Sequence, residues 1–297
     1  MKYTIAGSLG HISKPLAQKL INAGHHVTVI SSKESNRSAI EKLGAKAAIG
    51  SVEDVVFLTK AFAGADAVYT MVPPNFAPTN LKEWIGQIGK NYSEAVKANQ
   101  IKYVVNLSSV GAHLPDGCGP ASGLHRAEQA LNTLTGVNIK HLRPAYFFDN
   151  LLANVGMVKQ MNIIGSNFGE PDQKLVLADT SDITDAAFEE LSGLPFTGHS
   201  VRYIASDERS PGDVGKIIGS AIGKPSLPWV VFTNEQSTTG MLQAGLPEEI
   251  TKNYVEMGDA LHSGRMMEDY WKNHPLTLGK VKLEDFAKKF ATVYNAN

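Results

Sequence analysis

The 297-residue sequence predicts an α/β protein built on a doubly wound parallel sheet, with a smaller, mainly helical C-terminal lobe. Apolar runs of strand type alternate with helical periodicity through residues 1–150, as in parallel sheets covered by helices on both faces. The first run passes through a glycine turn into a helix, and a second strand follows at the distance of a βαβ unit. We expect a nucleotide-binding domain over residues 1–150, to which later segments return, and a smaller lobe for substrate or partner over 151–297.

The first two dozen residues predict a strand, a glycine turn and a helix. The apolar run Tyr3–Ala6 leads into the turn, and apolar residues at helical spacing begin at Ile12. The turn spells G-x-x-G-x-x-S, in which two glycines permit a sharp bend and let a phosphate approach the backbone. The unpaired amides and the dipole of the following helix would face that anion. We expect a dinucleotide diphosphate to bind at Gly7, Ser8, Leu9, Gly10, His11 and Ile12.

This spacing departs from the usual G-x-G-x-x-G fingerprint, because two residues separate the glycines and Ser13 takes the place of the last small residue. Serine is still small enough for the helix and the strand to pack closely. An ordinary strand-to-helix turn is the alternative interpretation. The position of the turn at the N-terminus and the second strand, His26–Ile30, favour nucleotide binding.

The end of the second strand carries no carboxylate, which bears on the choice of cofactor. An acidic residue at this place would accept hydrogen bonds from the adenosine ribose of NAD(H). Here the sequence has Ser31, Ser32 and Lys33, followed by Arg37, a set that suits the 2′-phosphate of NADP(H). We therefore expect NADP(H) rather than NAD(H). A solvated loop, or Glu34 turning towards the ribose, is the alternative.

The next two strands extend the expected cleft. A helix over Ala39–Leu43 and a strand over Ala45–Ile49 precede a helix that ends near Phe62, for which Ser51 is the expected cap and a neighbour of the adenine. The fourth strand, residues 65–72, stops at two prolines, which cannot continue a ladder. Ligands of open parallel sheets lie outside the carboxyl ends of the strands. The residues expected to line the cleft here are Met71, Val72, Pro73, Pro74 and Asn75.

The remaining elements follow from the same patterns. In the first half we expect a helix over Leu81–Ala98, a strand over Tyr103–Leu107, a loop over His113–Gly123, a helix over Gly123–Leu134 and a strand over Val137–Leu142, after which residues 143–150 leave the sheet. In the second half we expect strands over Lys174–Leu177, His199–Ala205 and Trp229–Phe232, helices ending at Leu191 and spanning Ser210–Gly223, and helix over most of 238–267 and 283–294. Asp182 is the expected cap of the helix that ends at Leu191.

Composition excludes several classes of protein. The net charge is −1 with acids and bases interspersed, so the dense basic face of a nucleic-acid or membrane-surface protein is missing. The single cysteine, Cys118, cannot form an internal disulfide and fits a reducing compartment. No apolar run approaches the roughly 20 residues of a membrane span, and Met1 leads directly into a strand. His25 and His26 have no carboxylate or thiol at metal-ligand spacing. We expect a cytoplasmic protein without a metal site.

Four motifs together carry a resemblance to a known family. They are the G-x-x-G-x-x-S turn, Val105–Ser109, Gly123-Leu124-His125 with Glu128, and Arg143–Asn150. In this order they resemble the NmrA-like group of atypical short-chain dehydrogenase/reductases, over essentially the whole chain. The resemblance implies a Rossmann fold that binds NADP(H). It also implies either reduction of small carbonyl or quinone substrates, or cofactor-dependent regulation without chemistry.

The sequence departs from this superfamily at the proton relay. Those reductases use a tyrosine as general acid with a lysine four residues later. None of the nine tyrosines here has a lysine at that spacing, and the helix where the pair belongs reads PASGLHRAE from Pro120. One interpretation is a reductase that depends mainly on hydride geometry, as reduction of a quinone permits. A second is a sensor of the NADPH/NADP⁺ balance that acts through a protein partner. A sugar-nucleotide epimerase or dehydratase, which would need the tyrosine, is the least favoured.

Four side chains are candidates for orienting a substrate. They are Ser108, Ser109, His125 and Tyr146, of which Ser108, His125 and Tyr146 are the expected catalytic residues. Each has a structural alternative, since serines at a strand end commonly satisfy backbone groups. His125 could lie on the surface of its helix. Tyr146, with the two phenylalanines that follow it, could pack between the lobes, although an aromatic wall also suits a flat quinone.

Overall fold

The computed structural model describes residues 1–296, and at its centre lies a seven-stranded sheet in the order β10-β6-β5-β4-β1-β2-β3. Every neighbouring pair of these strands is parallel. The chain winds outward from β1 in both directions, which confirms the predicted doubly wound sheet. Its strands are β1 (Lys2–Ile5), β2 (His26–Ser31), β3 (Lys46–Ile49), β4 (Ala67–Met71), β5 (Tyr103–Leu107), β6 (Asn138–Pro144) and β10 (His199–Ile204).

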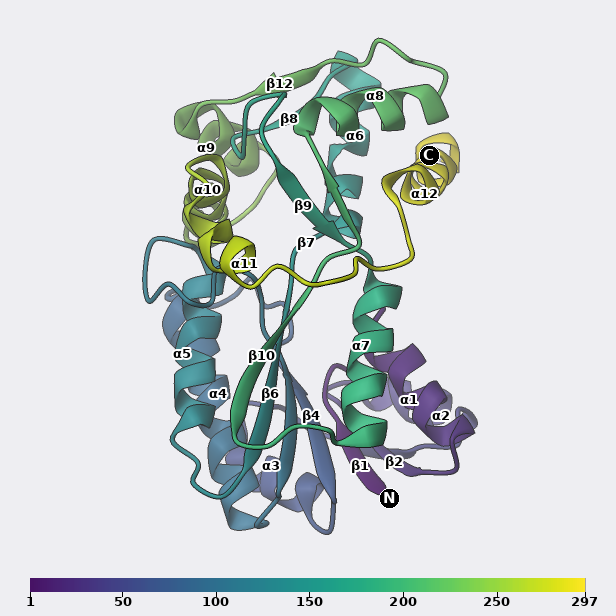
Figure 1. Ribbon diagram of the computed structural model, residues 1–297, viewed down its shortest axis with the longest axis vertical. Helices are drawn as coiled ribbons and strands as arrows, with labels where there is room; N and C mark the ends of the chain where they lie inside the picture. Colours follow the sequence, from purple (N-terminus) through teal and green to yellow (C-terminus); the bar gives the residue numbers. More distant parts are fainter. Residues whose placement is uncertain (297) are drawn as a thin grey trace.

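Helices cover both faces of this sheet (Figure 1). One face is covered by α1 (Ser13–Asn22), α2 (Arg37–Lys42) and α7 (Thr180–Gly193), and the other by α3 (Val55–Phe62), α4 (Leu81–Ala98) and α5 (Pro120–Asn132). The apolar stripe of α4 explains its place, because Ile88, Tyr92 and Val96 recur at helical spacing and are buried against the sheet. A short 3-10 turn, η1 (Glu34–Asn36), connects β2 to α2.

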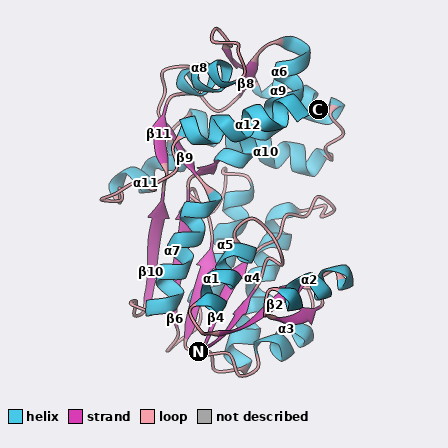
Figure 2. Cartoon of the chain, turned by 90° about the vertical axis from the view of Figure 1, so that its right-hand side faces the viewer, coloured by secondary structure: helices cyan, strands magenta, loops and turns pink. Residues whose placement is uncertain are grey.

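A smaller lobe lies beyond the carboxyl ends of the strands, above the sheet in Figures 1 and 2. It contains two small sheets, in the orders β11-β9-β7 and β12-β8. Its elements are β7 (Tyr146–Phe147), η2 (Phe148–Asn154), α6 (Val155–Met161), β8 (Ile164–Ser166), β9 (Leu175–Ala178), β11 (Asp207–Arg209), α8 (Pro211–Ala221), β12 (Trp229–Val231), α9 (Asn234–Gln243), α10 (Glu248–His262), η3 (Arg265–Met267), α11 (Glu268–Lys272) and α12 (Leu283–Ala296). Because β7, β8 and β11 have only two or three residues each, their pattern in the sequence is too short to read.

Two segments from the second half of the chain belong to the large sheet. Strand β10 pairs along its length with β6 and forms one edge of the sheet. Helix α7 lies beside α1, and the Tyr3 hydroxyl of β1 donates to the carbonyl of Leu191 at 2.8 Å. The chain therefore crosses between the lobes several times, which ties them together.

Two helix caps differ from those expected. Helix α3 is capped by Asp54, whose carboxylate accepts from the amides of Val56 and Phe57, whereas Ser51 accepts only from the amide of Glu53. Helix α7 is capped by Asp179, three residues before the expected Asp182. The prediction was wrong in both cases because several residues that can cap lie close together in the sequence and local spacing does not choose among them.

Asp182 has a different role. It is buried, and its carboxylate accepts hydrogen bonds from the Ser206 hydroxyl and from the amides of Lys280 and Val281, at 2.7 to 3.2 Å. A Cβ atom at Gly279 would lie 2.2 Å from an Asp182 oxygen, so the approach of this segment requires glycine. Asp182 thus holds the segment that leads into α12 against α7. Within residues 1–296, no helix is both long enough and apolar enough to cross a bilayer.

Candidate functional site

The glycine turn after β1 bends tightly against the start of α1. Gly7 has φ +96° and Ser8 has φ +56°, both in the left-handed region that favours glycine. A Cβ atom on Gly7 would lie 2.2 Å from the Ser13 hydroxyl oxygen. That hydroxyl donates to the carbonyl of Ala6 at 2.8 Å and is buried. Ser13 therefore fastens α1 to the end of β1, as the small third residue of the motif is expected to do.

The N-terminus of α1 opens onto the same turn. Its N-cap residue, Ile12, has no side chain that could accept a hydrogen bond. Within the described chain, the amides of His11, Ile12 and Ser13 donate to no protein atom, whereas the Gly10 amide donates to the carbonyl of Gly7. A Cβ atom on Gly10 would lie 3.1 Å from that carbonyl oxygen. Unpaired amides at a helix N-terminus form an anion site, and the close backbone leaves room for a phosphate.

A cleft of about 540 Å³ runs along the carboxyl ends of the strands at this turn. The predicted cofactor residues that line it are Gly7, Ser8, Gly10, His11, Ile12, Ser31, Ser32, Ser51, Met71, Pro73, Pro74 and Asn75. The predicted residues Leu9, Lys33, Arg37 and Val72 do not line it. The cleft is also lined by residues outside the expected cofactor set, namely Ser13, Ile30, Gly50, Val52, Glu53, Tyr69, Trp84, Leu107, Phe147, Asp149 and Thr180. Several of these come from distant segments, so no local pattern could have grouped them.

A second hollow, of about 950 Å³, lies along the outer sides of α4 and α5. It is larger, but it is lined mainly by helix surfaces and by residues near the amino ends of β5 and β6. Ligands of open parallel sheets bind at the opposite ends of the strands. The strand-end cleft is therefore the candidate site.

A small polar network occupies the end of β2. The amide nitrogen of Asn36 donates to the hydroxyls of both Ser8 and Ser31 at 3.0 Å, and the Ser8 hydroxyl donates to that of Ser31 at 2.9 Å. Ser31 is buried, while Asn36 lies in the turn that leads back from β2 to α2. The sequence places Asn36 in the expected ribose loop but contains no sign that it reaches back to the glycine turn. The network is uncharged, and no carboxylate takes part in it.

The two cations expected at this loop lie differently. Arg37 forms a two-point ion pair with Glu34, with nitrogen–oxygen distances of 2.5 and 3.0 Å. A hydrogen bond from Arg37 lowers the pKa of the exposed Glu34 carboxyl. The Lys33 side chain is exposed, and Lys33 follows the buried Ser31 by two residues. Both oxygens of Glu34, the one carboxylate that the sequence offered as a ribose partner, are therefore bonded to Arg37.

A triad of polar side chains links the glycine turn to the C-terminal helix. His11 contacts the Asp149 carboxylate through Nδ1 at 2.8 Å, and Lys289 of α12 donates to the other oxygen of Asp149 at 2.5 Å. Burial alone would raise the pKa of Asp149, but the hydrogen bonds from Lys289 and His11 bring it below its usual range. These residues are more than 130 positions apart in the chain. Sequence spacing contains no signal for this contact.

The three expected catalytic residues do not line the cleft. Ser108 is buried, and its hydroxyl has no partner among the described residues. His125 bonds through Nδ1 to the carbonyl of Ala112 at 2.9 Å and borders the hollow beside α4 and α5. Tyr146 packs against Phe168, with ring centroids 5.1 Å apart, and burial raises the pKa of its hydroxyl.

The helix that replaces the usual tyrosine and lysine pair serves packing. Gly123 of α5 allows close contact with α4, since its Cβ would lie 2.8 Å from the Ile85 side chain. Glu128 of the same helix is buried and forms a two-point ion pair with Arg143, at 2.6 and 3.0 Å. Two of the motifs that carry the family resemblance therefore meet in one buried ion pair.

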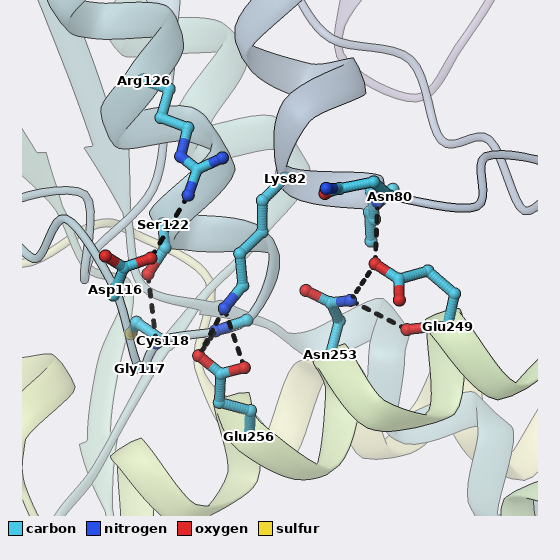
Figure 3. A network of polar contacts seen from close by, with 12 residues as sticks. Asn80, Lys82, Asp116, Gly117, Cys118, Ser122, Arg126, Glu249, Asn253 and Glu256 are labelled. Carbon is cyan, nitrogen blue, oxygen red and sulfur yellow. Dashed lines mark hydrogen bonds and ion pairs between the residues drawn. The ribbon is translucent and has the colours of Figure 1, made fainter.

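Helix α10 contacts the start of α4 and the loop before α5 through a polar cluster (Figure 3). Glu256 accepts two hydrogen bonds from Lys82 of α4, at 2.7 and 2.8 Å, and one from the amide of Gly119 at 3.3 Å. Glu249 accepts from the amide of Leu81 at 2.8 Å and from Asn253 at 2.9 Å, beside the Asn80 cap of α4. The segment Pro73–Asn75, which lines the cleft, precedes α4 and is separated from it by residues 76–80. The cluster thus fixes the small lobe next to the cleft.

Comparisons with known proteins give one family match and several similar structures. A family model described as NAD(P)H-binding matches residues 7–158. Among curated proteins, no sequence matches the chain.

Solved structures share the fold at low sequence identity. The NADPH-dependent quinone oxidoreductase of Escherichia coli in complex with NADPH is 17% identical with a TM-score of 0.82, over 97% of this chain and 99% of that one. The triphenylmethane reductase of Citrobacter sp. with NADP(H) is 18% identical with a TM-score of 0.78, over 97% and 99%. A nucleoside-diphosphate-sugar epimerase from Staphylococcus aureus is 14% identical with a TM-score of 0.77, over 97% and 100%. At these low sequence identities, the structural similarity shows only that the fold is shared.

Proposed function

Since this chain belongs to the NAD(P)H-binding family, in the NmrA-like group of atypical short-chain dehydrogenase/reductases, we propose that it is an NADPH-dependent reductase of a quinone or small carbonyl compound. The observation that carries the proposal is the anion site at the glycine turn. The unpaired amides of His11, Ile12 and Ser13 and the backbone at Gly7 and Gly10 fit a diphosphate. The cleft that extends from this site in both directions along the strand ends accommodates a dinucleotide.

The preference for NADPH rests on the end of β2. An NAD(H) site commonly has a carboxylate there, which would repel a 2′-phosphate. In this chain the strand ends at the buried Ser31, which is bonded to Ser8 and Asn36. Glu34, the carboxylate that the sequence offered as a ribose partner, is paired with Arg37. The neutral donors at the end of β2 therefore support NADP(H), and Lys33, which does not line the cleft, is an exposed cation two residues after Ser31.

The proposed chemistry depends on positioning. The bound cofactor supplies a hydride to an electron-poor carbon of the substrate, and the protein holds the two reactants within reach. The residues proposed to bind the cofactor are those of the predicted set that line the cleft. Ser108, His125 and Tyr146 lie outside it, so a proton from water completes the reduction in this proposal. The names of the Escherichia coli and Citrobacter enzymes, a quinone oxidoreductase and a triphenylmethane reductase, support a flat, conjugated small molecule as the substrate.

Two measurements test the proposal. Titration of the protein with NADPH and NADH, followed by cofactor fluorescence, should show tighter binding of NADPH. Oxidation of NADPH against a panel of quinones, followed at the absorbance of the reduced cofactor, should then show turnover. Tighter binding of NADH would contradict the cofactor preference. Tight NADPH binding with no turnover across the panel would favour the second candidate, a redox sensor that acts through a protein partner. The observation that supports this second candidate is the absence of the usual tyrosine and lysine pair from the sequence.

A further inference from the structure

Tyr69, in the middle of β4, is a buried residue whose hydroxyl forms no hydrogen bond with the described residues. No part of it is exposed to solvent, and its hydroxyl has no hydrogen-bond partner in the described part of the chain. Most buried polar groups are hydrogen-bonded, because leaving one unpaired costs free energy. Among the buried hydroxyls of residues 1–296 that lack a partner, that of Tyr69 belongs to a residue lining the candidate cleft, so it points to a partner that is not part of the chain.

The neighbouring strands cannot supply that partner. In the register of the sheet, Tyr69 lies opposite Ile5 of β1 and Val105 of β5, both buried apolar residues. Burial raises the pKa of the Tyr69 hydroxyl, so it remains a protonated donor at neutral pH. Tyr3 of β1 shows the usual arrangement, because its buried hydroxyl donates to the carbonyl of Leu191 at 2.8 Å.

Tyr69 is among the residues that line the candidate cofactor cleft. In the sheet order, β1 and its glycine turn lie between β2 and β3 on one side and β4 and β5 on the other. Ser31 of β2 and Ser51 after β3 line one end of the cleft, where the proposed adenosine half binds. Tyr69 of β4 and Leu107 of β5 line the opposite side. A dinucleotide whose diphosphate lies at β1 must therefore extend its nicotinamide half towards Tyr69.

We propose that the Tyr69 hydroxyl donates a hydrogen bond to the carboxamide oxygen of the nicotinamide and so positions the ring for hydride transfer. This inference rests on the proposed function, because it takes NADPH as the occupant of the cleft. The lining favours the ring over the ribose, since the cleft is also lined by Leu107, Met71 and Phe147, which are apolar. A neutral, flat ring loses little hydration there, and its carboxamide oxygen supplies the acceptor that the hydroxyl lacks.

The test is the variant Tyr69→Phe, which removes only the hydroxyl. Affinities for NADPH and for 2′,5′-ADP, which carries the adenosine half and no nicotinamide, are measured by isothermal titration calorimetry. We expect Tyr69→Phe to bind NADPH about fivefold to tenfold more weakly, the worth of one neutral hydrogen bond. Affinity for 2′,5′-ADP should not change. With the thionicotinamide analogue of the cofactor, the loss should be smaller, because sulfur is a weak acceptor.

The control variant is Tyr3→Phe, which removes a buried tyrosine hydroxyl that does have a partner. It should lower the melting temperature without changing the affinity for NADPH. Tyr69→Phe without cofactor should melt at the wild-type temperature or above it, because it removes an unpaired buried group.

Equal NADPH affinity in Tyr69→Phe and wild type would overturn the inference, as would an equal loss for NADPH and 2′,5′-ADP. A lower melting temperature of Tyr69→Phe, with unchanged affinities, would instead assign the hydroxyl to a buried water and also overturn it. Wild-type protein that binds neither NADPH nor 2′,5′-ADP would contradict the proposed function itself.

Discussion

Gly10 leaves little room for a side chain beside the proposed diphosphate. Its φ is outside the left-handed region, so the backbone can accept other residues, but a Cβ atom would lie 3.1 Å from the Gly7 carbonyl oxygen. We expect Gly10→Val to reduce NADPH affinity by about tenfold or more, because the branched side chain occupies the place of the phosphate. Fluorescence titration measures the affinity, and thermal unfolding checks that the fold persists.

A matched control exists in the smaller lobe. Gly240 lies in α9, and a Cβ atom there would meet nothing within 4 Å. Gly240→Val should leave the NADPH affinity unchanged. An unaltered affinity in Gly10→Val as well would show that the glycine turn does not hold the cofactor.

His141 makes the stability of the protein depend on pH. Burial lowers its pKa from 6.5 to about 4. Its Nδ1 lies 3.1 Å from the amide nitrogen of Asn106, and its Nε2 lies 2.9 Å from the amide oxygen of Asn132. These contacts fit a neutral ring whose Nε2 donates, so a second proton on Nδ1 would face another donor.

The sign of the effect follows from proton linkage. Above pH 6.5 the ring is neutral in both the folded and the unfolded chain, so it contributes no pH dependence. Between pH 6.5 and 4 the unfolded chain binds a proton that the folded chain does not. The free energy of unfolding therefore decreases as the pH is lowered from 6.5 to 4. At about 1.4 kcal/mol for each pKa unit, the free energy of unfolding should drop by on the order of 3 kcal/mol across this window.

Urea denaturation at a series of pH values measures this change. In His141→Gln the slope between pH 6.5 and 4 should be markedly flatter than in the wild type, although the variant is less stable at pH 8. An equal slope in both proteins would mean that other groups cause the acid sensitivity.

Two residues near the start of α3 are expected to differ in role: one stabilises the helix and the other contacts the cofactor. Asp54 caps the helix through the amides of Val56 and Phe57, while Ser51 lines the cleft. Asp54→Ala should lower the free energy of unfolding by about 1 kcal/mol, as loss of an N-cap does. Its affinity for NADPH should stay close to that of the wild type.

Ser51→Ala should show the reverse pattern. Its effect on unfolding should be within about 0.5 kcal/mol, as for most surface substitutions, while NADPH binds a few-fold more weakly because one donor near the adenine is lost. Urea unfolding and fluorescence titration of both variants provide the comparison. A large loss of stability in Ser51→Ala would mean that Ser51, rather than Asp54, caps α3.

The contact between the two lobes depends on a partly buried ion pair. Lys82 of α4 and Glu256 of α10 are 2.7 Å apart, with side chains 18% and 24% exposed (Figure 3). We expect a double-mutant cycle with Lys82→Met and Glu256→Gln to give a coupling of about 1 kcal/mol, at the upper end for pairs that remain accessible to water. Urea unfolding of the four proteins supplies the numbers.

The exposed pair of Lys288 and Asp285, at 3.0 Å, is the control for this cycle. Its side chains are 77% and 54% exposed, so solvent screens the attraction. Its coupling should be no more than about 0.5 kcal/mol. Equal couplings for the two pairs would mean that burial at the lobe contact adds nothing.

Much of the large lobe could be predicted from the sequence, because its signals are local. The bounds of α4 and β5 match the expected ranges, since a helix of 18 residues with one apolar stripe and a strand of five mostly apolar residues are unambiguous. Twelve residues of the expected cofactor set line one cleft. They do so because parallel strands place their carboxyl ends at one edge, so each βα turn that the sequence reveals arrives at the same place.

The rest depends on contacts between distant parts of the chain. Asn36 with Ser8, His11 with Asp149 and Lys289, and Glu256 with Lys82 are pairs whose members no periodicity connects. The expected catalytic residues lie outside the cleft for the same reason, since the direction of a side chain depends on how its helix or strand packs. The sequence by itself determined the glycine turn and the order of strands and helices in the large sheet, because each has a pattern among neighbouring residues. Only the tertiary structure decided what surrounds that turn, including the unpaired hydroxyl of Tyr69, because a buried group finds its partners in space rather than along the chain.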